Sequence, residues 1–83
     1  MKHAGPETLE RLAPLLAAVR ARSELVERRP GVFYRKSRAF LHFHEDPEGL
    51  FADIRPGDEW LRVNVTETAH RAEFEEILAR AFD

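Results

Sequence analysis

The sequence lacks several features, and each absence excludes a class of protein. Its 83 residues include no cysteine, which excludes disulfide bonds and thiolate metal sites and predicts a reducing compartment. No apolar run approaches the roughly 18 residues that a membrane-spanning helix needs, and the first residues lack the apolar core of a secretory signal. The sequence therefore predicts a cytoplasmic protein that does not associate with membranes.

Groups that perform covalent catalysis are also scarce. The serine hydroxyls come only from Ser23 and Ser37, and neither stands in the strand-to-helix turn of a nucleophile elbow. The 4 glycines stand beside prolines or in turns and form no glycine-rich phosphate loop. These absences favour a binding protein over an enzyme, and the sequence predicts no cofactor.

The length limits the chain to a single domain over residues 1–83. A chain of this size buries only about 60% of the surface that it exposes when unfolded, so it supports one core between two layers. Apolar residues make up 43% of the chain and charged residues 34%, a composition typical of a globular protein.

Hydrophobic periodicity predicts three segments within this domain. Apolar residues spaced by three and four predict helical structure over 6–28, with a short first turn and a main helix from about Pro14. Short β-branched and aromatic segments separated by turn residues predict an antiparallel meander of three to four strands over 32–65. A second apolar stripe predicts a helix over 66–82. The predicted fold is a two-layer α+β domain in the order helix, meander, helix.

Alternation along the predicted strands divides their side chains between two faces of the sheet. The first face is apolar and is expected to meet the helices; it contains Leu41, Phe43, Leu50, Ala52, Ile54, Leu61, Val63 and Val65. The second face mixes aromatic, titratable and amide groups; it contains Phe40, His42, His44, Phe51, Asp53, Arg55, Trp60, Arg62 and Asn64. Because two helices suffice to cover one face, we expect the second face to be open and its exposed rings to need a partner.

Charge is distributed unevenly along the chain. The net charge is −2, but residues 20–38 carry +5 and residues 45–59 carry −5. Within these segments Arg35, Lys36, Arg38 and Arg55 are expected to form a basic rim that faces phosphates. Alternatively, the two segments lie side by side and neutralise each other, and the negative net charge weakens non-specific binding to nucleic acid.

Four interpretations of the second face remain open. The N-terminal turn or a helix covers it, a second copy of the chain buries it in a homodimer, it binds a ligand or nucleic acid, or it holds a metal ion. We favour a non-enzymatic binding or interaction module. Its candidate ligand-binding residues are Phe40, His42, His44, Phe51, Asp53, Trp60 and Arg62, together with Arg55 and Arg35.

The metal interpretation depends on His42 and His44, which project from the same face of one strand. Asp53 on the next strand is the candidate third ligand, and His70 is a more distant one. A metal-assisted enzyme centred on these residues is the alternative to a binding module.

Several segments resemble known bacterial families. Residues 27–33 (ERRPGVF), 38–40 (RAF) and 60–63 (WLRV), with the closing helix, resemble the small YjbR/MmcQ-like proteins. The strand carrying His42 and His44, followed by Asp53, is similar to the bacterial "luciferase domain" family of unclear activity. The resemblance covers about residues 25–83 and implies helices packed on an antiparallel sheet, a shape likened to DNA-binding domains. Neither family implies a catalytic residue here.

Overall fold

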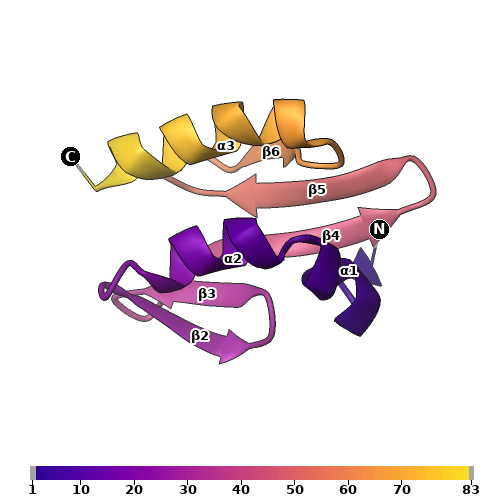
Figure 1. The fold of residues 1–83 in the computed structure, drawn as a ribbon. Helices are drawn as coiled ribbons and strands as arrows, with labels where there is room; N and C mark the ends of the chain where they lie inside the picture. Colours follow the sequence, from indigo (N-terminus) through magenta and orange to yellow (C-terminus); the bar gives the residue numbers. More distant parts are fainter. Residues whose placement is uncertain (1, 83) are drawn as a thin grey trace.

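An antiparallel sheet with helices on one side forms the body of the protein in the computed structural model, which describes residues 2–82 (Figure 1). The elements in chain order are β1 (Lys2–His3), α1 (Pro6–Arg11), α2 (Ala13–Arg20), β2 (Leu25–Arg29), β3 (Val32–Arg35), β4 (Arg38–Asp46), β5 (Gly49–Ile54), β6 (Leu61–Asn64) and α3 (Thr68–Ala81). The α+β class predicted from the sequence is confirmed. None of the helices in the described part of the chain has the length and apolar character needed to cross a membrane.

The strands follow one another in the order β2-β3-β4-β5-β6, so the meander is longer than predicted. The long strand β4 lies at its centre and pairs with β5 along one edge. The other edge of β4 pairs with β3 over its first half and with the short strand β1 near its end. In this second pairing His3 lies directly opposite His44. The N-terminal residues are therefore part of the sheet.

Two prolines set the boundaries of the first two helices. Pro6 and Pro14 each stand in the first turn of a helix, where a missing N–H costs little, so α1 and α2 are separate as expected. The predicted helix over 6–28 is wrong beyond Arg20, because Leu25–Arg29 forms β2 instead. The two-residue turn Pro30-Gly31 joins β2 directly to β3, with Gly31 at a φ of +79°. A hairpin therefore forms where the helix was expected to continue.

The core lies between the helices and the apolar face of the sheet. Its buried residues are Leu12, Leu15, Leu16, Val19, Phe33, Phe40, Leu41, Phe43, Leu50, Ala52, Ile54, Val63, Val65, Phe74 and Leu78. Most of the predicted apolar face is thus confirmed as core. Leu61 is the exception: it begins the outer strand β6 and is 40% exposed.

Phe40 departs from the predicted alternation. The register between β3 and β4 passes from Phe33 opposite Leu41 to Tyr34 opposite Ala39, which leaves Phe40 as the extra residue of a β-bulge. Phe40 and Leu41 are consequently both buried, and the Phe40 ring lies 5.7 Å from the ring of Phe82. The prediction that Phe40 belongs to the second face with the histidines is therefore wrong.

The opposite side of the sheet, called the open face below, carries His42, His44, Phe51, Asp53, Arg62 and the neighbouring Trp60. The helices in residues 2–82 contribute their buried side chains to the core on the other side. In Figure 1, α2 runs in front of β4 and α3 runs beside β6. Within residues 2–82, β1 extends this face at the edge of β4, and its His3 ring contacts the histidines of β4.

Candidate functional site

Three titratable side chains meet on the open face. His42 and His44 project from β4, and Asp53 lies opposite His42 on β5. Nδ1 of His42 is 2.8 Å from Nε2 of His44, and the same Nε2 is 3.1 Å from Oδ2 of Asp53. We call these three residues the His–Asp cluster.

Arg62 fixes the carboxylate of this cluster. It lies opposite Asp53 on β6 and donates from Nε to Oδ1 at 2.8 Å and from Nη2 to Oδ2 at 2.9 Å. These hydrogen bonds lower the pKa of Asp53, although burial acts in the opposite direction. Asp53 is therefore a charged carboxylate in a fixed orientation, with only 9% of its surface exposed.

The two imidazoles of the cluster are half-buried. Burial is the main cause that lowers the pKa of both His42 and His44, and the charge of Asp53 offsets part of the shift. Both rings are therefore neutral at pH 7, and each has one nitrogen that carries a lone pair. Nδ1 of His44 is buried and has no hydrogen-bond partner within the described part of the chain.

A third imidazole adjoins the cluster and was missed by the sequence analysis. The ring of His3 stacks on His44 at a centroid distance of 5.2 Å and lies 6.0 Å from His42. The apolar periodicity of the sequence gives no sign that two residues near the N-terminus join the central strand. The one signal in the sequence is His3 itself, a further histidine in a short chain that already contains His42 and His44.

Trp60 lies on the open face next to the cluster. Its indole is 41% exposed, its centroid is 4.8 Å from that of His42, and the Arg55 guanidinium carbon lies 4.8 Å from the ring centre. An imidazole and a guanidinium thus hold the indole while leaving part of it accessible. Phe51 is half-buried, opposite His44 and Asn64.

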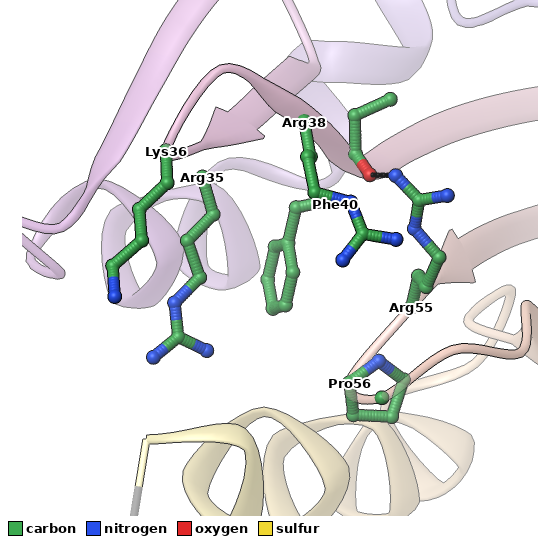
Figure 2. Close-up of a pocket in the computed structure, with 8 residues that line it drawn as sticks. Arg35, Lys36, Arg38, Phe40, Arg55 and Pro56 are labelled. Carbon is green, nitrogen blue, oxygen red and sulfur yellow. Dashed lines mark hydrogen bonds between the residues drawn. The ribbon is translucent and has the colours of Figure 1, made fainter.

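A basic pocket of about 210 Å³ lies between the turn that joins β3 to β4 and the segment that follows β5 (Figure 2). Its lining includes Arg35, Lys36, Arg38, Phe40, Arg55 and Pro56. Figure 2 shows Arg35 and Lys36 on one side, Arg55 and Pro56 on the other, and the Phe40 ring between them. Arg55 also donates to the carbonyl of Ala39, which holds its side chain at the boundary between the pocket and the open face.

The turn that carries part of this pocket is conformationally costly. Lys36 and Ser37 have φ values of +50° and +67°, a region that side chains other than glycine and asparagine rarely adopt. The turn places Arg35 directly opposite Arg38, and like charges in this position destabilise a strand pair. Arg35 is steadied by a 2.8 Å hydrogen bond to the carbonyl of Ala81 and by the ring of Phe82.

The structure thus divides the predicted site residues between two places. His42, His44, Asp53, Trp60 and Arg62 meet on the open face with Phe51 beside them, and Arg55 joins them to the basic pocket. Arg35, which was expected in the basic rim, lines the pocket, and its side chain reaches the end of α3 on the helix side. His70, the distant metal candidate, lies on α3 and is exposed, away from the cluster.

Comparison of the chain with protein-family models, with curated proteins and with solved structures gives no match. The resemblance to the YjbR/MmcQ-like and luciferase-domain families therefore stays a prediction.

Proposed function

We propose that this protein is a non-enzymatic, cytoplasmic binding module whose basic pocket takes a phosphate group and whose Trp60 stacks on the ring of the same ligand. A phosphate attached to a planar heterocycle, as in a nucleotide, combines these two chemistries. The ligand is either a free nucleotide or one unit of a single strand.

The observation that carries this proposal is the lack of acidic partners in the basic pocket. Within residues 2–82, the ion pairs join Lys2 to Glu45, Arg20 to Glu27, His44 and Arg62 to Asp53, and Arg80 to Glu76. None of them includes a cation of the pocket. No ion pair within residues 2–82 joins the acidic segment 45–59 to the basic rim, which supports an anion as the complementary ligand.

Arg55 connects the two halves of the proposed site. It lines the pocket and also lies over the indole of Trp60, so a phosphate bound by Arg55 has an aromatic surface next to it. Base stacking on aromatic side chains contributes about 1–3 kcal/mol per base and tolerates any base. The arrangement therefore favours ligands with a ring over inorganic phosphate.

The lining of the pocket supports binding rather than catalysis. It consists of arginine, lysine, alanine, phenylalanine, proline and glycine side chains. Apart from the amine of Lys36, these residues offer no group that commonly transfers a proton or attacks a phosphorus atom.

Calorimetric titration with inorganic phosphate, adenosine monophosphate and a short single-stranded oligonucleotide tests the proposal. We expect adenosine monophosphate to bind more tightly than phosphate, with an affinity that falls as salt is added. Arg38→Glu should weaken both ligands more than about 10-fold, because charge-assisted contacts become repulsive. Trp60→Ala should cost the nucleotide about 1–3 kcal/mol and leave phosphate unchanged.

Arg80→Ala is the matched control, since Arg80 is exposed on α3 and pairs with Glu76. This variant should bind both ligands as the wild type does. If neither phosphate nor nucleotide binds, or if Arg38→Glu binds them as well as the wild type, the proposal is wrong. Self-association through the open face stays a prediction, and sedimentation analysis of the wild type and of Phe51→Glu checks it.

A further inference from the structure

We infer that the His–Asp cluster is a binding site for a divalent transition-metal ion such as Zn²⁺. His42, His44 and Asp53 each offer one ligand atom, and these atoms lie within 4.8 Å of one another. Two imidazole nitrogens and one carboxylate oxygen form a donor set typical of zinc and of related ions. This site is separate from the phosphate pocket and goes beyond the proposed function.

The spacing of the ligand atoms suits a shared ion. Zinc binds nitrogen and oxygen at about 2.0–2.1 Å, which places the ligand atoms of a tetrahedral site about 3.3 Å apart. Two of the pairs in the cluster are separated by 2.8 Å and 3.1 Å. The third pair lies within 4.8 Å, so side-chain rotations that bring these two atoms together would give the spacing that an ion requires.

Hydrogen bonding alone leaves the cluster poorly satisfied. Nε2 of His44 faces both Nδ1 of His42 and Oδ2 of Asp53, but it carries at most one proton. With the proton on Nε2, a single hydrogen would have to form hydrogen bonds both to Nδ1 of His42 and to Oδ2 of Asp53. Without it, the Nε2 lone pair faces the carboxylate, and the proton moves to Nδ1, which is buried without a partner. A cation between the three atoms removes the conflict between their lone pairs.

The surroundings provide support and a further ligand position. Arg62 donates to both oxygens of the Asp53 carboxylate, at 2.8 Å and 2.9 Å, and so orients this ligand as the outer partners of metal ligands do. The ring of His3 lies against His44 and is the nearest candidate for a fourth ligand. Three protein ligands with one replaceable position is the arrangement of zinc sites that keep a water.

The test is a calorimetric titration of tag-free, chelator-treated protein with Zn²⁺ at neutral pH. We expect one ion per chain. His44→Ala should weaken Zn²⁺ binding by at least about 10–100-fold, because even the loss of a residue that only supports a metal ligand reduces affinity by that factor. His70→Ala is the matched control, because His70 is exposed on α3 and lies outside the cluster; it should bind Zn²⁺ as the wild type does.

Nuclear magnetic resonance of the wild-type protein keeps the test informative if His44→Ala folds poorly. Zn²⁺ should shift the imidazole resonances of His42 and His44 and leave those of His70 in place. Absence of stoichiometric binding, or shifts centred on His70, would overturn the inference. Because His44 lies outside the basic pocket, His44→Ala should still bind adenosine monophosphate, so the metal site and the proposed function fail or succeed independently.

Discussion

Oδ2 of Asp53 lies 3.1 Å from Nε2 of His44, although the residue directly across from Asp53 on β4 is His42. This diagonal contact places one imidazole nitrogen between a second imidazole and a carboxylate. The arrangement makes the cluster sensitive to protonation and to the orientation of Asp53, and both properties can be measured.

The metal-free protein should become less stable as the pH falls through the histidine range. Burial holds the pKa of His42 and His44 below their ordinary value in the folded state. Below about pH 6.5 the unfolded chain therefore binds more protons than the folded protein, so the free energy of unfolding decreases until the folded rings are protonated.

Urea denaturation across about pH 5–8, with a chelator present, measures this dependence. The double variant His42→Gln/His44→Gln should show a flatter profile. An equal slope in the wild type and the variant would contradict the prediction. The carboxyl groups with lowered pKa values, Asp53, Glu27 and Glu45, lose their contributions only at more acidic pH, below about pH 4.

Arg62→Gln should raise the pKa of the Asp53 carboxyl, because the hydrogen bonds from Arg62 are the main cause that lowers it. A carboxyl pKa that is lower in the folded state stabilises the protein at pH values above the pKa of the same group in the unfolded chain. This contribution is lost as the pH falls through the pKa of the folded state. The variant should therefore lose stability at neutral pH. Titration of the carboxyl carbon by nuclear magnetic resonance gives the pKa directly, and an unchanged value would show that Arg62 does not set it.

Phe40→Ala should destabilise the protein by about 3–5 kcal/mol, the usual cost of emptying a buried phenylalanine site. Phe40 is 3% exposed, whereas Phe51 is only half-buried on the open face. Phe51→Ala should therefore cost clearly less in the same urea denaturation experiment. Equal losses of unfolding free energy in the two variants would mean that the β-bulge does not direct the Phe40 side chain toward the core.

Gly49→Ala should cost about 1–3 kcal/mol. Gly49 has a φ of +150°, and a Cβ atom at this position would collide with Oγ1 of Thr66. That oxygen accepts a 2.9 Å hydrogen bond from the backbone N–H of Leu50, so the methyl group would disrupt the contact between β5 and the start of α3. Thermal unfolding measures the loss.

Gly57→Ala provides the control for this prediction, since a Cβ atom there meets no other group and the backbone is outside the left-handed region. It should leave the stability unchanged or raise it by about 0.4–1 kcal/mol, because alanine restricts the unfolded chain. If both alanine variants unfold at the same temperature as the wild type, Gly49 does not lie as close to Thr66 as described, and the prediction is wrong.

The sequence predicted the fold class because periodicity reports which residues are buried. The apolar stripes around Leu16 and Phe74 and the alternation around Phe43 all mark the core. It did not predict β2, because Val26 also continues the helical spacing of Leu16 and Val19, and only the pairing of Val26 with Tyr34 decides between the two structures. The local residue pattern does not show which segment a strand pairs with.

The same limit applies to the candidate site. Alternation correctly placed His42, His44 and Asp53 on one face, since each lies in a regular stretch of strand. It misplaced Phe40, because a β-bulge shifts the alternation by one residue without a distinctive residue type. The approach of His3 to the cluster depends on the pairing of β1 with β4, a contact between distant parts of the chain.

The chain contains 1 tryptophan, and both His42 and Arg55 contact its ring. Indole fluorescence responds to nearby charge and to displacement of a stacked neighbour. An occupant of the basic pocket that draws Arg55 away, and an ion that fixes His42, should each change the emission of Trp60 in their own way. The protein therefore contains an intrinsic optical probe for both events, and titrating each ligand alone follows either of them without any added label.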